Sequence, residues 1–200
     1  LLAREWDYRA QAAIARLTKN AAFRYKAYIE QIDYATNRGL DRNQMERLAT
    51  LDFVHKAQNL FITGSSGTGK SYLACALGHE ACKRGFRTFY ANAPKLLGAL
   101  KVAKVKGTPE TELKKIERCR LLILDDLFIV PSTPKERPYC LTSSRTGMNG
   151  NPSSSHRSTP SSNWYDMVGD PTIADAILDR IIHTAHTIEL YGESMRKFTG

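Results

Sequence analysis

Long apolar runs are absent from the sequence, and no stretch approaches the roughly 18 consecutive apolar residues that a membrane-spanning helix needs. The four cysteines show no Cys-x-x-Cys spacing and no histidine at the separation typical of a zinc site. These absences exclude a helical membrane span and a disulfide-stapled scaffold, and they favour a reducing compartment, the cytoplasm. Cys75 and Cys82 lie seven residues apart in a stretch with helical periodicity, so we expect both to be small core residues.

The first residues, Leu-Leu-Ala-Arg-Glu, contain no basic segment followed by an apolar one. We therefore expect either no signal peptide or one that has already been removed, and the missing initiator methionine indicates a fragment. The composition is that of a globular chain, with 42% hydrophobic and 24% charged residues over 200 positions. That length is enough for one domain with a real core, or for one domain with a small appendage.

Positive charge is concentrated in one part of the chain. The net charge is +9, and residues 83–120 carry eleven Lys/Arg against three Glu, a surplus of eight. Such a segment is typical of a surface that neutralises phosphates, which favours a polyanion partner and, among polyanions, nucleic acid. The alternative is a solvated helix surface that merely keeps the protein in solution, and charge alone leaves both interpretations open.

Helical and strand-like patterns alternate along most of the chain. We expect helices over residues 4–35, 42–54, 71–84, 94–104, from 109 onward and after 171, and strands at 59–63, 86–91, 121–124 and 187–191. Asp41 is a suitable N-cap, and Gly85 is a suitable C-terminal stop. Strands that alternate with helices predict an α/β fold whose parallel sheet is covered by helices on both faces.

A phosphate-binding motif follows the strand expected at 59–63. It fits the pattern G-x-x-x-x-G-K-[ST] with Gly64, Ser65, Ser66, Gly67, Thr68, Gly69, Lys70 and Ser71. Glycines let the backbone wrap the phosphates, so that successive N–H groups and the helix N-terminus face the negative charge. Lys70 then contacts the β- and γ-phosphates, and the Ser71 hydroxyl joins the shell of a magnesium ion. The motif predicts ATP and Mg²⁺ as cofactors.

Two adjacent carboxylates end the unbroken apolar strand expected at 121–124. In a parallel sheet, the C-terminal end of this strand places Asp125 and Asp126 beside the phosphate-binding loop. Asp125 is the expected Mg²⁺ ligand, directly or through water. Asp126 is expected to orient or deprotonate the attacking water, which makes it and Lys70 catalytic candidates. On their own, two acidic residues would merely mark the end of a strand.

These motifs, the segment 40–59 and the tail around Asn163-Trp-Tyr-Asp-Met and Gly192-Glu-Ser-Met-Arg196 resemble the IstB-like ATP-binding proteins. Those proteins are transposition helpers of bacterial insertion sequences and are related to DnaC-type helicase loaders within the AAA+ class. The resemblance implies a P-loop α/β ATPase domain over 39–200, with an N-terminal helical segment over 1–38. It also implies a homo-oligomer that acts on largely non-specific duplex DNA together with a transposase. By the same resemblance, Arg180 reaches the γ-phosphate of a neighbouring subunit and is catalytic, and Arg196 lies over the nucleotide of its own subunit.

Residues 139–162 depart from that family pattern. The stretch is rich in Ser and Thr and contains no Asp, Glu, Val or Ile, where the family has a helix and then a buried strand ending in a polar residue. If the serine codons are of the TCN type, reading residues 139–157 in the shifted frame can give LLDIIEDRYERKSIIITSQ, an amphipathic helix followed by a β-branched strand. We interpret the segment as the product of two compensating frameshifts, and a natural Ser-rich insertion is the alternative. With its present residues, it is expected to remove a central strand from the sheet.

The sequence therefore predicts an ATP-hydrolysing, DNA-associated helper of transposition. Within the same class, a replicative helicase loader of the DnaC type is an alternative. Two alternative functions come from other classes: a small P-loop kinase, and a nucleotide-binding module that does not hydrolyse its nucleotide. A kinase needs a mobile lid with arginines, which the pattern does not show, and a module without turnover would follow from the altered stretch 139–162.

Overall fold

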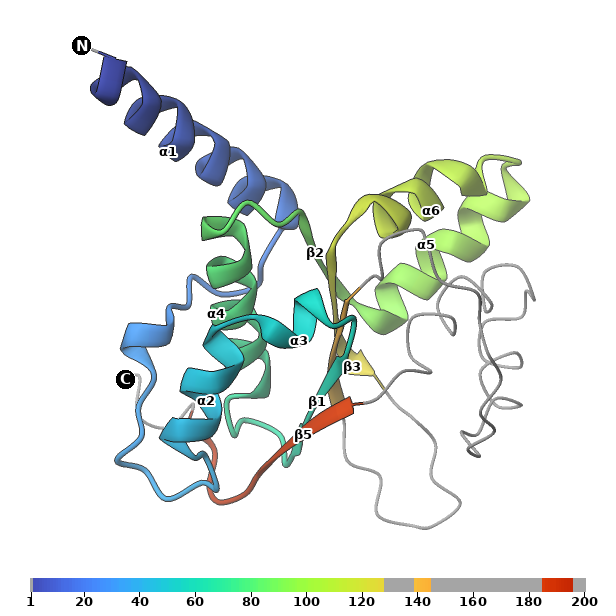
Figure 1. Ribbon diagram of the computed structural model, residues 1–200. Coiled ribbons are helices and arrows are strands. Elements are labelled where there is room, and N and C mark those ends of the chain that lie inside the picture. Colours follow the sequence, from blue (N-terminus) through green and yellow to red (C-terminus); the bar gives the residue numbers. More distant parts are fainter. Residues whose placement is uncertain (1, 128–138, 145–184, 196–200) are drawn as a thin grey trace.

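The computed structural model describes residues 2–127, 139–144 and 185–195 of the chain (Figure 1). Its helices are α1 (Leu2–Ala21), the 3₁₀ turn η1 (Ile29–Gln31), α2 (Arg42–Ala49), α3 (Asp52–His55), α4 (Lys70–Lys83), α5 (Ala93–Val105) and α6 (Pro109–Arg118). Its strands are β1 (Asn59–Gly64), β2 (Thr88–Asn92), β3 (Leu121–Leu127), β4 (Tyr139–Ser144) and β5 (Ala185–Leu190). No helix in these described ranges combines the length and apolarity that crossing a membrane requires.

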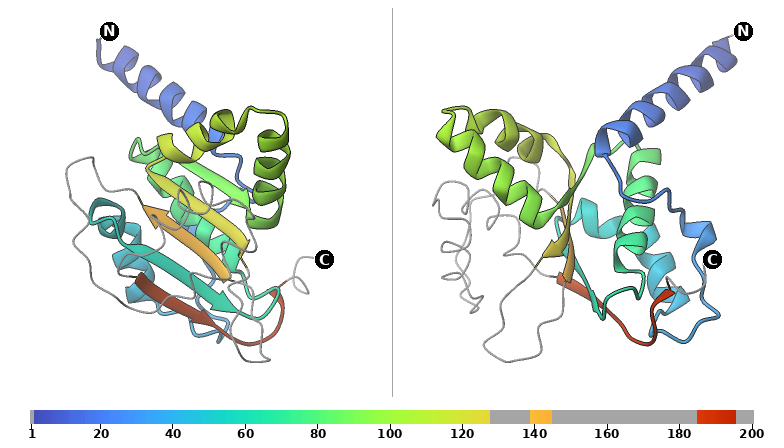
Figure 2. Two further views of the ribbon diagram at one scale, coloured as in Figure 1. Left: turned by 90° about the vertical axis from the view of Figure 1, so that its right-hand side faces the viewer. Right: turned by 180° about the vertical axis from the view of Figure 1, so that it is seen from behind.

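A five-stranded sheet in the order β2-β3-β4-β1-β5 forms the centre of the molecule. Helices α2, α3 and α4 cover one face, and the α5–α6 pair covers the other (Figures 1 and 2). Each face has its own apolar core: Leu60, Ile62 and Ile123 pack with α4 on one side, while Leu122 and Leu124 pack with α5 and α6 on the other. The predicted α/β fold with helices on both faces is thereby confirmed.

Local chemistry explains where several of these elements begin and end. Asp41 caps α2 as predicted, since its side chain accepts a hydrogen bond from the Asn43 amide at 2.9 Å. Asn92 caps α5 in the same way, by accepting from the Lys95 amide at 3.1 Å. Gly85 follows α4 with a φ of +82°, the left-handed conformation that commonly ends a helix.

Strand β4 contradicts two expectations about the sheet. Residues 139–144, which lie in the Ser-rich stretch, occupy the central position between β3 and β1, so the sheet has not lost this strand. The strand also runs antiparallel to both neighbours, whereas the other pairs, β1–β5 and β2–β3, are parallel as predicted for the sheet. Backbone hydrogen bonding between strands does not depend on the side chains, so this short segment can complete the sheet despite its composition. Residues 145–162 lie outside the described part of the chain.

The N-terminal helix is shorter than predicted. Helix α1 ends at Ala21, and Ala22 has a φ of +56°, so the helix expected over 4–35 stops about halfway. The following segment runs irregularly along α4, where the rings of Phe23 and Tyr28 lie 4.3 and 5.3 Å from the ring of His79. The apolar residues of 23–34 therefore pack against α4 from an irregular segment and do not form the apolar face of a single helix. Helix α1 itself projects from the body of the molecule (Figure 1).

Candidate nucleotide site

The phosphate-binding loop connects β1 to α4 and depends on glycine at two close approaches. Gly67 has a φ of +85°, and a Cβ atom there would lie 2.1 Å from Ser194 Oγ. Gly69 has a φ of +95°, and a Cβ atom there would lie 2.6 Å from Arg38 Nη1. The loop is thus fixed between the C-terminal segment and the N-terminal segment of the chain, and only glycine fits both positions without strain.

Lys70 is buried at the first position of α4, with its ammonium group turned toward the loop. Its Nζ atom donates hydrogen bonds to the carbonyl oxygens of Gly64 at 2.9 Å and Ser65 at 2.7 Å. The Thr68 hydroxyl donates to the Ser65 carbonyl at 2.9 Å and tightens the same turn. The cation therefore lies inside the curve of the loop, where a bound phosphate chain would meet it.

Asp125 is almost completely buried and has partners on both carboxylate oxygens. Its Oδ1 accepts hydrogen bonds from Ser71 Oγ at 2.8 Å and from the Asp126 amide at 3.0 Å. Its Oδ2 accepts from the Tyr90 hydroxyl at 2.5 Å and lies 3.6 Å from Arg24 Nη1. The two residues predicted to hold a metal, Ser71 and Asp125, are therefore in direct contact although they are 54 positions apart.

Asp126 has a left-handed backbone conformation with a φ of +55°. Its Oδ2 accepts a hydrogen bond from Asn92 Nδ2 at 2.8 Å, and the residue lines the same pocket as Lys70 and Ser71. An aspartate held in this uncommon conformation is a sign of a functional site, because the surrounding structure must offset the strain. The two adjacent carboxylates thus point in different directions, Asp125 into the protein and Asp126 toward the pocket.

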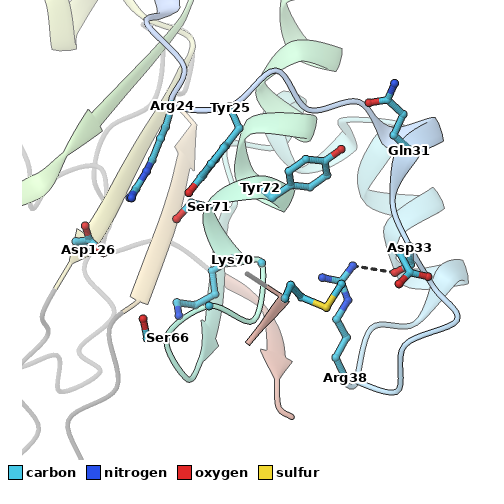
Figure 3. Close-up of a pocket in the computed structure, with 13 residues that line it drawn as sticks. Arg24, Tyr25, Gln31, Asp33, Arg38, Ser66, Lys70, Ser71, Tyr72 and Asp126 are labelled. Carbon is cyan, nitrogen blue, oxygen red and sulfur yellow. Dashed lines mark hydrogen bonds between the residues drawn. The ribbon is translucent and has the colours of Figure 1, made fainter. Parts of the chain in front are cut away.

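A pocket of about 490 Å³ lies over the N-terminus of α4 (Figure 3). In Figure 3, Lys70 lies between Asp126 on one side and Arg38 on the other. The lining residues are Arg24, Tyr25, Gln31, Asp33, Arg38, Ser66, Gly67, Gly69, Lys70, Ser71, Tyr72, Asp126 and Met195. Five of these belong to the first 38 residues, none of which was predicted as a site residue. The aromatic and charged residues there are visible in the sequence, but their spacing suggests one long helix and gives no sign of a pocket.

Arg38 is hydrogen-bonded to the phosphate-binding loop. Only 5% of its surface is exposed, and its guanidinium donates to the Thr68 carbonyl at 3.2 Å and to the Asp33 carbonyl at 2.8 Å. Burial lowers the pKa of Arg38, yet a guanidinium remains charged at neutral pH. The arginine therefore places a buried positive charge against a loop that is built to bind anions, at the wall of the same pocket.

The C-terminal segment also reaches this site. The Met195 amide donates a hydrogen bond to the Gly67 carbonyl at 2.9 Å, which ties the chain after β5 to the loop. Arg180 and Arg196, the two arginines implied by the family resemblance, lie outside the described residues, as does the helix expected after residue 171. The structure therefore brings together Lys70, Ser71, Asp125 and Asp126 and does not address the two arginines.

The donor set at Ser71 and Asp125 fits a magnesium ion that is bound together with phosphates. Among the described residues, no group of three or more His, Cys, Asp or Glu side chains could hold a metal without other ligands. One hydroxyl and one carboxylate are typical of Mg²⁺ sites in which phosphate oxygens and water complete the octahedral shell. The geometry thus suits a metal that arrives with a nucleotide.

Comparison with known families agrees with this geometry. The family model described as "IstB-like ATP binding protein" matches residues 1–199. The chain belongs to this family. It is 39% identical over 199 residues to the insertion sequence ATP-binding protein y4pL of Sinorhizobium fredii, covering 98% of this chain and 80% of that protein. It is 32% identical over 197 residues to the ATP-binding protein of insertion sequence IS21 from Pseudomonas aeruginosa, with 98% and 74% covered.

Among solved structures, the crystal structure of DnaI resembles this IstB-like chain with a TM-score of 0.51 at 22% identity. The likeness covers 82% of this chain and 91% of DnaI, and it supports the shared P-loop α/β fold. The family named from the motifs is therefore confirmed, together with its fold.

The part of the basic segment that belongs to α5 and α6 forms a second feature, on the other side of the sheet. We call the exposed cations of α5, α6 and their connection the basic face; they are Lys95, Lys101, Lys104, Lys106, Lys114, Lys115 and Arg118. Lys114 and Lys115 form ion pairs with Glu110 and Glu112 of their own helix, at 3.3 and 2.7 Å. The basic face contributes none of the residues that line the pocket described above. Its charge is therefore not explained by nucleotide binding.

Proposed function

We propose that this IstB-like protein binds and hydrolyses ATP with Mg²⁺ as a cytoplasmic helper of transposition, assembles into a homo-oligomer on duplex DNA and acts with a transposase. One observation carries the nucleotide part of the proposal. Lys70, Ser71 and the Asp125–Asp126 pair, from two different elements, converge at the N-terminus of α4 beside a pocket of about 490 Å³. The names of the curated relatives support the association with insertion sequences.

Each residue has a distinct task in this proposal. The backbone amides of Gly64 to Gly69 hold the phosphate chain, and Lys70 neutralises its β/γ end. Ser71 and Asp125 would hold Mg²⁺, which supplies charge neutralisation of the phosphates when bound. Asp126 accepts a proton from the attacking water or orients that water. Arg180 would act on the γ-phosphate of a neighbouring subunit, and Arg196, which follows Met195 in sequence, on the nucleotide of its own.

Binding and turnover are tested separately, with a fluorescent ATP analogue and with phosphate release. We expect nucleotide binding that strengthens with Mg²⁺, and release of phosphate that rises when duplex DNA is added. Replacing Ser71 by Ala should raise the Mg²⁺ concentration needed for both signals, because one metal donor is removed. A wild-type chain that binds no nucleotide at any Mg²⁺ concentration would refute the proposal.

The DNA part of the proposal depends on the basic face. Its lysines are spread over two helices without the side-chain pattern that reads base edges, so we expect contacts to phosphates and little dependence on sequence. Changing Lys101, Lys104 and Lys106 to Ala should weaken binding to all duplexes alike. It should also flatten the slope of log affinity against log salt by up to about 0.9 for each phosphate that is no longer neutralised.

A matched control separates this effect from net charge. Lys26, Arg47 and Lys56 are likewise exposed but lie outside the basic face, so their replacement by Ala removes the same charge from elsewhere on the chain. We expect the control variant to retain most of the affinity and the salt slope. Equal losses in both variants would mean that only the overall charge matters. The assembly itself is tested by sedimentation with and without ATP and DNA, and the partnership by stimulation of the transposase from the same insertion sequence.

A second candidate function is nucleotide binding without turnover, and β4 is the observation that favours it. Because β4 is antiparallel to β3, the first residue of β4, Tyr139, pairs with Leu127 near the site. In a parallel strand, the last residue would lie at this end of the sheet. The family resemblance places a polar residue that assists hydrolysis at the end of this strand. Normal ATP affinity with no phosphate release, with and without DNA, would support this second function.

A further inference from the structure

The partners of Asp125 on its Oδ2 side are not accounted for by the motifs. We propose that Tyr90 is a positioning residue that fixes the Asp125 carboxylate so that its Oδ1 side remains directed at Ser71 and the metal. This inference rests on the proposed function, because it concerns the same Mg²⁺–nucleotide site. It adds to that function a residue from a strand that carries no nucleotide-binding motif.

The register of the sheet brings Tyr90 to Asp125. On β2, Tyr90 pairs with Ile123 of β3, and Asp125 lies two residues beyond Ile123, so both side chains are on the same face of the sheet. The Tyr90 hydroxyl donates to Asp125 Oδ2 at 2.5 Å, and the tyrosine is 8% exposed within the core that packs against α4. A buried hydroxyl needs hydrogen-bond partners, and the carboxylate is one of them.

The two sides of the carboxylate have different partners. Oδ1 accepts from Ser71 Oγ and the Asp126 amide, and both of these donors belong to the nucleotide site. Oδ2 faces Tyr90 in the core. Rotation of the carboxylate about its bond to Cβ would break these hydrogen bonds together. The hydrogen bond from Tyr90 therefore fixes the orientation of the carboxylate plane, and with it the contact between Oδ1 and Ser71. A metal ligand with a fixed plane loses less entropy when it binds the ion.

Arg24 also approaches Oδ2, and the magnitudes indicate which partner dominates. Its guanidinium lies 3.6 Å from the oxygen, and its side chain is 44% exposed. Exposed ion pairs contribute little because water screens them and long side chains lose entropy. A short buried hydrogen bond to a charged group is stronger. We therefore assign the positioning role to Tyr90 and expect a smaller contribution from Arg24.

The test is a Mg²⁺ titration of the binding of a fluorescent, non-hydrolysable ATP analogue to the full chain. Tyr90→Phe removes the hydroxyl and keeps the ring, so we expect the Mg²⁺ midpoint to rise about threefold to tenfold. Affinity in the presence of a metal chelator should change less than about twofold, since the phosphate loop is intact. Tyr28→Phe is the matched control, because Tyr28 packs against His79 in the same part of the structure, and it should leave the midpoint unchanged.

A double-mutant cycle identifies the route of the effect. In an Asp125→Asn background, Tyr90→Phe should no longer shift the Mg²⁺ midpoint, because the carboxylate through which it acts is gone. A shift of equal size in that background would show that Tyr90 acts elsewhere and would overturn the proposal. An unchanged Mg²⁺ midpoint in Tyr90→Phe would also overturn the proposal. So would a Mg²⁺ midpoint that rises in an Arg24→Gln variant but not in Tyr90→Phe. If the wild-type chain binds the analogue but these shifts are missing, only the role of Tyr90 fails; if it binds no nucleotide, the proposed function fails as well.

Discussion

Replacement of Lys70 by Ala is the sharpest test of the nucleotide site. Lys70 is only 8% exposed, so water contributes little screening around its ammonium group within the phosphate-binding loop. A hydrogen bond that involves a charged group contributes about 1.5–3 kcal/mol. Its removal should therefore weaken ATP binding by about tenfold to 150-fold, because every 1.4 kcal/mol corresponds to a factor of about ten.

The same variant also lacks the hydrogen bonds from Nζ to the carbonyls of Gly64 and Ser65, so folding must be measured beside binding. The assay is titration with a fluorescent ATP analogue, accompanied by thermal unfolding without nucleotide. Lys83→Ala is the matched control: it removes a cation from the other end of α4, and its affinity should stay within about twofold of wild type. Unchanged ATP affinity in a folded Lys70→Ala protein would refute the assignment of the loop as a phosphate site.

Four further outcomes are expected. Asp126→Asn should retain ATP binding and lose phosphate release, because it removes a water-orienting carboxylate and leaves the proposed metal ligands; equal loss of both would contradict this division. Gly67→Ala should reduce both ATP affinity and melting temperature, since the added Cβ would meet Ser194 at 2.1 Å; a normal affinity would show that the loop adapts. Burial lowers the pKa of His79, so the unfolded state binds a proton more readily and stability should fall between about pH 7 and pH 5; His79→Gln should reduce that fall in melting temperature. Replacing residues 139–157 by LLDIIEDRYERKSIIITSQ should raise melting temperature and ATPase rate together; if the unaltered chain already matches it in both, the frameshift hypothesis is wrong, and the coding DNA tests that hypothesis directly.

The parts of the fold that could be predicted are those encoded by local chemistry. The apolar run of β1, the glycine-rich loop and the start of α4 form one contiguous signal, and the Asp41 cap is recognisable from its residue type alone. Their positions needed no knowledge of what lies across the sheet. The same is true of Asp125 and Asp126, which were predicted because they follow the apolar run 121–124 and which lie within β3.

The parts that could not be predicted depend on contacts between distant residues. The direction of β4 is set by pairing with two neighbours, and strand direction leaves no trace in a six-residue sequence. Arg38 is separated from the Thr68 carbonyl by thirty positions, and Tyr90 from Asp125 by thirty-five. Each looks like an ordinary surface arginine or core tyrosine until the sheet and the N-terminal segment bring the partners together.

The projection of α1 has a mechanical consequence. The helix meets the body near its C-terminal end (Figure 2). Trp6 and Tyr8, near the other end, are 77% and 74% exposed. At about 1.5 Å per residue its twenty residues make a rigid rod about 30 Å long. Ala22, where the helix ends, is two residues from Arg24, whose guanidinium lies 3.6 Å from Asp125. By geometry alone, a rotation of about 10° about Ala22 would move the far tip by about 5 Å, so any displacement of the chain beside Arg24 would be larger at Trp6 and Tyr8 than at its origin.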